Sequence, residues 1–498
     1  MSNQEKNQHL MWRAGFGPAV EQLTDLSRIT PQQLFTALKK SSAKKPEFID
    51  VADDFLKGLF AGIEEAGRQQ RRNEMSEDER KKVQQKQREG VRSLNLNWLK
   101  LFVNTDAQLR EKTAFFWHGH FACRNLNVFF QQGLLDVLRR NALGSFRIML
   151  HEVSKTAAML NFLNNQQNKK DQPNENFARE VMELFTMGRG HYSENDIREA
   201  ARAFTGWSAG FNGEFIFRRF QHDFGSKTVL GKTGNFDGAE VLDILLEHKQ
   251  TAKYVTQKLY RFFVNDNPDN EKIDWLADRF YKSDYDIGKL MDDIFNSNWF
   301  YEAKNIGSKI KSPIELIAGI RRMLPMKLEN EEAFTFLQRA LGQVLFYPPN
   351  VAGWPGGKTW IDSSSLMLRM RIPQLLNETD ELNLTNKDDD DQMMGRKTTD
   401  TENKMMGYGK RSVIKATIEW KDYLNHFAFM KSSKEFSGTK IEKVQKDQLV
   451  NEISKSLLQT SNPVNNKLIQ QHADDSNMEK FIRSATLQLM STPEYQLC

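Results

Sequence analysis

The chain has 498 residues, 39% hydrophobic and 11% aromatic, and carries a net charge of +5 from 70 basic and 65 acidic residues. This composition can fill a sizeable core, and the nearly balanced charge argues against a nucleic-acid or membrane-surface partner. With two cysteines, Cys123 and Cys498, the sequence excludes a disulfide framework and a cysteine metal cluster. It shows no membrane span and no signal peptide, so we expect a cytoplasmic protein, or an exported protein whose signal has been removed.

Helical patterns of apolar residues recur along the chain and predict a mainly α fold with a multi-helix globular core. Residues 9–66 predict short helices, one of which starts at Pro31. Residues 67–90 are highly charged, and Ser76 with Glu79 three residues later forms a capping box. This pattern predicts a solvated polar helix, or a connection that leads into one.

The most distinctive stretch runs from Phe115 to Phe121 and reads Phe-Phe-Trp-His-Gly-His-Phe. It follows a helical pattern, and Gly119 weakens helical continuity, so we expect His118 and His120 near the end of a helix. The surrounding rings predict a core position. Two imidazoles at that position indicate either a polar site that the core touches or two satisfied core histidines.

A second distinctive segment places carboxylates at helical spacing. Glu180 and Glu183 lie beside an apolar stripe on a helix that we expect to begin near Asn174 and to end at Gly188. Arg179 lies beside them, so ion pairs along the helix are available.

The residues between 211 and 231 change character. Interleaved Phe and Gly residues predict one small β-hairpin near 211–231, with His222 and Asp223 near its tip and Lys227 after it. Helical patterns return from 238 to 345.

The rest of the chain divides into a rigid loop, an insertion and a last helical part. Residues 347–361 contain three Pro, three Gly and Trp354. Residues 385–411 are acidic and Met-rich, which predicts a disordered insertion. We therefore predict a helical core domain over 1–375 and a C-terminal helical segment over 412–498 that packs on the core.

Several motifs, in this order, resemble those of the domain-of-unknown-function 1800 family (DUF1800). They are listed here as they stand in the chain: His9-Leu10 with Arg13-Ala14-Gly15-Phe16-Gly17, Phe116-Trp117-His118-Gly119-His120-Phe121, Asn174-Glu175-Asn176-Phe177-Ala178-Arg179-Glu180, Arg198-Glu199-Ala200-Ala201-Arg202, His222-Asp223 and Pro348-Pro349-Asn350-Val351-Ala352-Gly353-Trp354-Pro355-Gly356-Gly357. The resemblance implies a mostly helical protein without an assigned reaction. It also implies a bacterial source, frequent export and a gene beside that of a sulfatase-like protein.

The first functional hypothesis is an enzyme with a His/Glu pocket that binds a divalent transition metal. Imidazole and carboxylate groups suit Zn, Fe, Mn or Cu. The candidate ligands, with the two glutamates beside them, are His118, His120, His222 and Asp223. Without a metal, Glu180 or Glu183 in an apolar setting would have a raised pKa and act as a catalytic acid or base.

Two other interpretations stay open. In the structural one, the glutamates pair with nearby arginines and the histidines are core residues. In the other, the protein is a non-catalytic binding or assembly partner of a sulfatase-like protein. Its candidate binding residues, for an anionic group and for a partner surface, are Arg179, Arg202, Lys227 and Trp354. An enzyme would bring the histidines and Glu180 together in a concave pocket, whereas a scaffold would expose an apolar patch around Trp354.

Overall fold

The computed structural model describes residues 1–59, 73–210, 212–377, 416–427, 443–459 and 464–498. Helices make up most of the described chain, which confirms the predicted mainly α class. The helices of the first half are α1 (Asn3–Arg13), α2 (Pro31–Ser42), α3 (Asp54–Leu59), α5 (Glu77–Asn104), α6 (Gln108–His120), α7 (Val128–Arg140), α8 (Phe146–Ser154), α9 (Ala157–Phe162), α10 (Asn176–Glu180), a π-helix (Val181–Met187) and α11 (Glu194–Ala203). Those of the second half are α12 (Gly238–Glu247), α13 (Lys249–Phe263), α14 (Asn270–Lys282), α15 (Ile287–Phe295), α16 (Pro313–Met323), α17 (Glu332–Ala340), α18 (Ser363–Asn377), α20 (Trp420–His426), α21 (Lys443–Leu457), α22 (Asn466–His472) and α23 (Met478–Met490).

The described strands form three short antiparallel pairs: β1 (Trp207–Ala209) with β2 (Phe215–Phe217), β3 (Lys227–Val229) with β4 (Lys232–Gly234), and β5 (Met326–Leu328) with β6 (Ala416–Ile418). The single hairpin predicted near 211–231 is therefore two hairpins in a row. The third pair joins segments far apart in the sequence, which local turn signals do not reveal.

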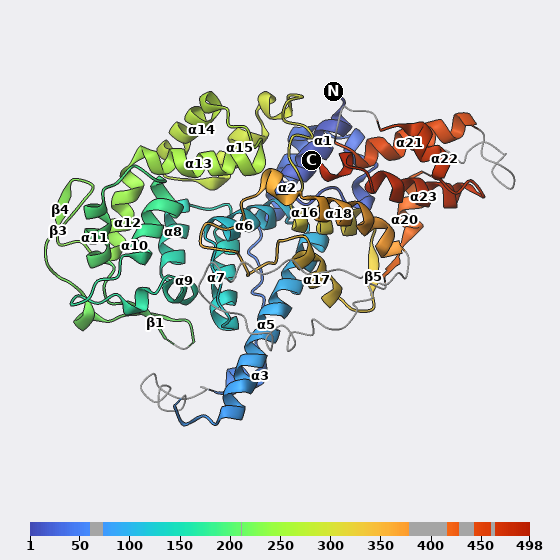
Figure 1. The fold of residues 1–498 in the computed structure, drawn as a ribbon. Helices are drawn as coiled ribbons and strands as arrows, with labels where there is room; N and C mark the ends of the chain where they lie inside the picture. Colours follow the sequence, from blue (N-terminus) through green and yellow to red (C-terminus); the bar gives the residue numbers. More distant parts are fainter. Residues whose placement is uncertain (60–72, 211, 378–415, 428–442, 460–463) are drawn as a thin grey trace.

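Helix starts follow the predicted capping chemistry. The Ser76 hydroxyl accepts a hydrogen bond from the backbone N–H of Glu79 (3.2 Å), and the Glu79 carboxylate accepts one from the N–H of Ser76 (2.9 Å). The described part of the charged segment is the first half of α5, where most side chains are exposed; from Gly90 onward the inner face of the helix is buried. Figure 1 shows this first half of α5 extending away from the main body. Water therefore solvates the charged side chains of the first half of α5, and the buried face of the second half packs into the core.

The core is continuous through the described chain and joins buried residues from Leu10 to Tyr495. Helix α6 lies at its centre, where Trp117 is fully buried and stacks on Phe146 with ring centroids 5.4 Å apart. No described helix has the length and apolar character that crossing a bilayer requires. The predicted insertion over 385–411 lies outside the described residues, and the division into domains stays a prediction.

The two ends of the chain lie side by side, as Figure 1 shows near α1. The buried Arg13 guanidinium donates to the carbonyl oxygen of Asn305 (2.9 Å) and to a main-chain oxygen of Cys498 (2.8 Å). Deeper in the same region, the Lys112 ammonium on α6 forms a buried ion pair with the Glu315 carboxylate on α16. These polar contacts fix the N-terminal helix, the central helix and the last residues in one arrangement.

Candidate functional site

The C-terminal end of α6 is the meeting point of the distinctive segments. The backbone N–H of Phe346 donates to Nε2 of His118 (3.1 Å), so this nitrogen carries no proton and Nδ1 holds it. The imidazole contacts the rings of Trp98 and Trp354, with centroids 5.2 and 5.6 Å away. Burial lowers the pKa of His118 to about 3, so the ring is neutral near pH 7. His118 thus positions the segment that leads into the loop over residues 347–361, which we call the Trp354 loop.

The Trp354 loop rests on the α6 end through a contact between two glycines. Gly353 has a φ of +81°, and a Cβ at this position would overlap the carbonyl oxygen of Gly119. A side chain is therefore excluded at Gly353 for two reasons, the backbone conformation and the lack of space. Trp354 itself is half-buried, and among the described residues of 347–361 no large hydrophobic side chain is exposed, so the apolar patch that a scaffold role predicts gains no support there.

His120 faces a different neighbour. Its Nε2 donates to the carbonyl oxygen of Phe185 in the π-helix (3.1 Å), and its buried Nδ1 has no hydrogen-bond partner among the described residues. Burial, with the nearby Lys258 ammonium, lowers the pKa of His120 well below its usual value. The histidine and carboxylate segments thus contact each other, but through the hydrogen bond from His120 to the backbone carbonyl oxygen of Phe185 and not through a glutamate side chain.

The π-helix ends in carbonyls that side chains satisfy. The last C=O groups of a helix have no partner within it. Besides the His120 bond, Nε2 of Gln250 donates to the Met187 oxygen (3.0 Å), and Nζ of Lys258 lies 3.5 Å from the Leu184 oxygen. Helix α13 and the end of α6 together hold this unusual turn in place.

The sequence predicted an ordinary helix over this segment and did not reveal the π geometry. The Thr186 hydroxyl donates to the Val181 carbonyl (2.7 Å), and Gly188 ends the segment with a φ of +77° against the Tyr254 ring. Turns of π-helix are rare and occur frequently at functional sites. Here the π-helix follows Glu180 directly and contains Glu183.

The two glutamates have opposite environments. Burial raises the pKa of Glu180, the neighbouring Glu183 carboxylate adds to the effect, and no hydrogen bond to its side chain occurs among the described residues. Burial alone would also raise the pKa of Glu183, but hydrogen bonds from Arg189 and from the Tyr192 hydroxyl (2.8 Å) lower it. The two neighbouring carboxyls therefore have pKa values that are shifted in opposite directions from that of an ordinary glutamate.

Lys258 is a member of this region that the sequence analysis missed. Burial lowers its pKa to about 8, and no ion pair to its ammonium occurs among the described residues. Its Nζ lies 5.5 Å from the centroid of the Tyr254 ring, one turn earlier on α13. The sequence contains a pattern that could have indicated this position. Tyr254, Lys258 and Phe262 follow each other at a spacing of four residues, so the lysine lies on a helical stripe that aromatic residues otherwise occupy.

The other predicted ligands form a separate local network. Nδ1 of His222 donates to the carbonyl oxygen of Thr205 (2.8 Å), and the Asp223 carboxylate accepts from Nε of Arg202 (2.7 Å). Nζ of Lys227 donates to the Asp223 carbonyl oxygen (2.6 Å). These contacts hold the loop between the two hairpins against α11.

The candidate anion-binding arginine of the carboxylate helix is also engaged within the chain. Arg179 forms ion pairs with Glu194 (2.7 Å) and Glu175 (3.1 Å), and the hydrogen bonds that it donates to Glu194 in particular raise its pKa. These contacts, like those of Arg202 and Lys227, use donors that an anionic ligand would need.

The predicted metal ligands are not brought together. His118 and His120 use their Nε2 atoms on different elements, and His222 contacts Thr205 instead of either histidine segment. Across the part of the chain that the structure describes, no group of three or more His, Cys, Asp or Glu side chains is placed to hold a metal ion.

Comparison with known proteins gives a family and no relative of known activity. A search of the curated proteins and a search of the solved structures each found no match. A family model described as "Protein of unknown function (DUF1800)" matches residues 9–497, nearly the whole chain. The protein is therefore a member of the DUF1800 family.

Proposed function

We propose that the face formed by the end of α10 and the π-helix is an acid–base catalytic site, with Glu180 as proton donor and Glu183 as the ionised partner. The observation that carries this proposal is the contrast between two half-buried carboxyls, one without a hydrogen bond among the described residues and the other held by Arg189 and Tyr192. Neighbouring titratable groups with opposed environments are the usual mark of an acid–base pair.

The chemistry that suits such a pair is hydrolysis of a polar substrate. Glu180 would give its proton to the leaving oxygen, and the Glu183 carboxylate would take a proton from the attacking water. A divalent transition metal at His118 and His120 gains no support from this geometry, because their Nε2 atoms serve Phe346 and Phe185.

A direct test combines a substrate panel with carboxyl titration. Wild-type protein is assayed against nitrophenyl glycosides, esters and phosphates. Glu180→Gln is expected to lower turnover by about 100-fold or more, the usual range for loss of a general acid. Glu175→Gln, at the N-cap of the same helix but paired with Arg179, is the matched control and is expected to keep activity.

The titration is read by NMR from labelled glutamate carboxyls and needs no substrate. The Glu180 carboxyl should titrate above 4.5, and Glu183→Gln should bring its pKa down because a like charge is removed. Titration of Glu180 at or below 4.5, or full activity in Glu180→Gln, contradicts the proposal.

A second candidate function, partner binding, is favoured by an exposed aromatic group away from Trp354. Phe217, Phe220 and Phe224 are 42%, 91% and 49% exposed, and two of them contact the His222 ring. Contiguous exposed rings are a common mark of an interaction surface. The partner we would test is the sulfatase-like protein that the family resemblance suggests.

In that test the two proteins are expressed together and purified through a tag on one of them. Phe220→Ser should abolish co-purification, whereas Trp275→Ser, which changes a ring that is 44% exposed on α14, should not. Equal recovery with both variants, or no recovery with wild type, speaks against this role.

A further inference from the structure

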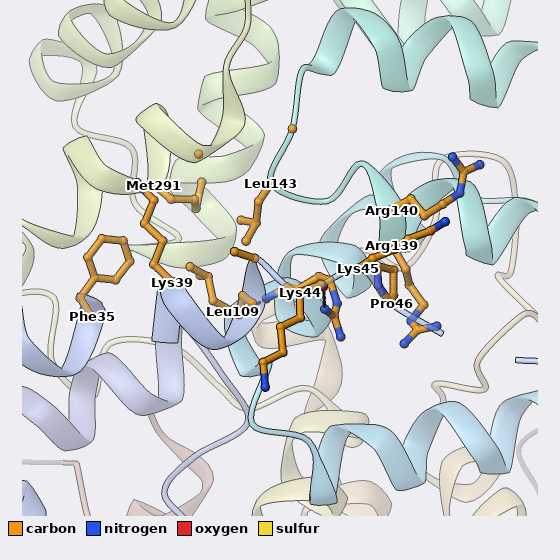
Figure 2. A pocket seen from close by; sticks show the side chains of 15 residues that line it. Phe35, Lys39, Lys44, Lys45, Pro46, Leu109, Arg139, Arg140, Leu143 and Met291 are labelled. Atoms are coloured by element: carbon orange, nitrogen blue, oxygen red, sulfur yellow. Dashed lines mark hydrogen bonds between the residues drawn. The ribbon is translucent and has the colours of Figure 1, made fainter. Parts of the chain in front are cut away.

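A cavity of about 450 Å³ lies between α2, α6, α7 and α15, in a region that the proposed catalytic site does not use. Figure 2 shows its two kinds of lining: the apolar side chains Phe35, Leu143 and Met291 on one side, and Lys45, with the arginines of α7, on the other. Ligand cavities in proteins commonly measure ~300–1,000 Å³ and are mostly apolar with a few polar groups. This cavity fits that description.

The charged side chains around the cavity carry an excess of positive charge. The Glu111 carboxylate is fully buried and is shared by two buried guanidiniums, that of Arg110 (Nε to Oε1, 3.1 Å) and that of Arg139 (Nε to Oε2, 2.9 Å). The Arg110 side chain is 10% exposed and that of Arg139 is 3% exposed. Two buried cations therefore share one anion, and burial makes an uncompensated charge expensive.

Arg110 also keeps a free donor. Its Nε donates to Glu111 and its Nη1 to the carbonyl oxygen of Lys44, while Nη2 makes no hydrogen bond within the described residues. In Arg139, by contrast, each of the three nitrogens already donates, Nε and Nη2 to Glu111 and Nη1 to the carbonyl oxygen of Glu47. Arg110 is thus the buried group that can receive an anion from the cavity.

Two lysines extend the positive field to the cavity rim. Lys44 and Lys45 are exposed, and no ion pair of either ammonium occurs in the described part of the chain. The other basic lining residues are paired: Lys39 with Asp292, and Arg140 with Asp136 at 2.7 Å. None of the residues that line the cavity in the described structure is acidic.

We propose that this cavity binds a small amphipathic anion, with an acidic head group at Arg110, Lys44 and Lys45 and an apolar body against Phe35 and Met291. The head supplies the negative charge that the two arginines and Glu111 lack. The body covers apolar walls that water would otherwise meet. A carboxylate and a phosphate ester share this chemistry, and both are included in the test.

The test is calorimetric titration of the full chain with octanoate, octyl phosphate and the uncharged octyl glucoside. We expect one or both anions to bind and the glucoside not to bind. Lys44→Glu/Lys45→Glu should weaken anion binding at least about tenfold, because two charges at the rim change sign. The matched control is Lys169→Glu/Lys170→Glu, another adjacent and exposed lysine pair, and should stay within about twofold of wild type.

A milder pair, Lys44→Gln/Lys45→Gln, separates loss of attraction from new repulsion and should weaken binding by a smaller factor. Added salt should also weaken binding, since part of the attraction acts through the exposed rim. The proposal is overturned if neither anion binds wild type at millimolar concentration, if the glucoside binds equally well, or if both lysine pairs have the same effect.

Discussion

Replacing Glu315 by glutamine should destabilise the protein strongly, because it leaves the Lys112 ammonium buried without its counter-charge. The Lys112 side chain is 1% exposed and that of Glu315 is 11% exposed. The Glu315 carboxylate also accepts from the backbone N–H of Ser312 (2.7 Å) at the start of α16. The substitution keeps the shape of the side chain and removes only its charge.

The structure gives the size of the effect. Burial alone would raise the pKa of Glu315, but the charge and hydrogen bond of Lys112 and the contacts with Ser312 lower it from 4.5 to about 2. One pKa unit corresponds to about 1.4 kcal/mol, so this interaction stabilises the folded state by about 3 kcal/mol at neutral pH. Since the pKa is lower in the folded state, the contribution is complete above 4.5 and is lost as the pH falls toward 2.

The assay is thermal and urea unfolding of wild type and Glu315→Gln between pH 2 and pH 7. For a chain of 498 residues that unfolds as one unit, about 3 kcal/mol corresponds to a fall of about 3 °C in the melting temperature. Glu302→Gln is the matched control, because the Glu302 carboxylate pairs with Lys304 at 3.2 Å while 51% exposed. Such surface pairs contribute ~0–1 kcal/mol.

The double variant Lys112→Met/Glu315→Gln should lose less stability than the sum of the single changes, because it leaves no buried charge unpaired. The reasoning is refuted if Glu315→Gln is as stable as Glu302→Gln at pH 7. It is also refuted if the variant keeps the wild-type loss of stability between pH 4.5 and pH 2.

Three further changes probe the end of α6 and its neighbours. Lys258→Met should stabilise the protein by up to about 3 kcal/mol at pH 7, because the folded state lowers the pKa of this lysine from 10.5 to about 8. In urea unfolding this gain should shrink as the pH rises from 8 to 10.5, and a variant with wild-type stability contradicts the prediction. The wild type should lose stability between pH 6.5 and pH 3, because His118 stays neutral in the folded state to about pH 3 while the same histidine in the unfolded chain binds a proton below 6.5. His118→Phe should remove this part of the loss, and a pH profile identical to that of the wild type rules the prediction out. Gly353→Ala should cost about 2 kcal/mol or more and alter tryptophan fluorescence, because the new Cβ meets the Gly119 oxygen at a positive φ; a wild-type spectrum and melting temperature argue against that contact.

Local signals in the sequence predicted the helical part of the fold well. Thr30 before Pro31, and Ser76 before Glu79, cap helices as expected, because capping depends on residues three positions apart. The pairing of β5 with β6 could not be predicted in this way. It joins Met326 to Ile418 through contacts that only the tertiary fold determines.

The candidate site was predicted in part. The sequence identified Glu180 and Glu183, and they lie on one helical segment as their spacing requires. It did not identify the partners that separate their pKa values, since Arg189 and Tyr192 lie in the turn after the π-helix and contact Glu183 from there. The sequence also suggested that His118 and His120 bind one metal ion together. In the structure the two side chains contact different neighbours, because residues two positions apart on a helix point in different directions.

The contact between Arg13 and a main-chain oxygen of Cys498 spans 485 positions of sequence, which bears on how the chain folds during synthesis. At translation rates of ~5–20 residues per second, α1 emerges about half a minute or more before its last acceptor exists. Until then the Arg13 guanidinium has to stay hydrated or find other partners, because its acceptors on Asn305 and Cys498 come later in the chain. Helix α1 is thus made long before the contacts of Arg13 are complete, and a chaperone that holds nascent chains would meet this side chain exposed.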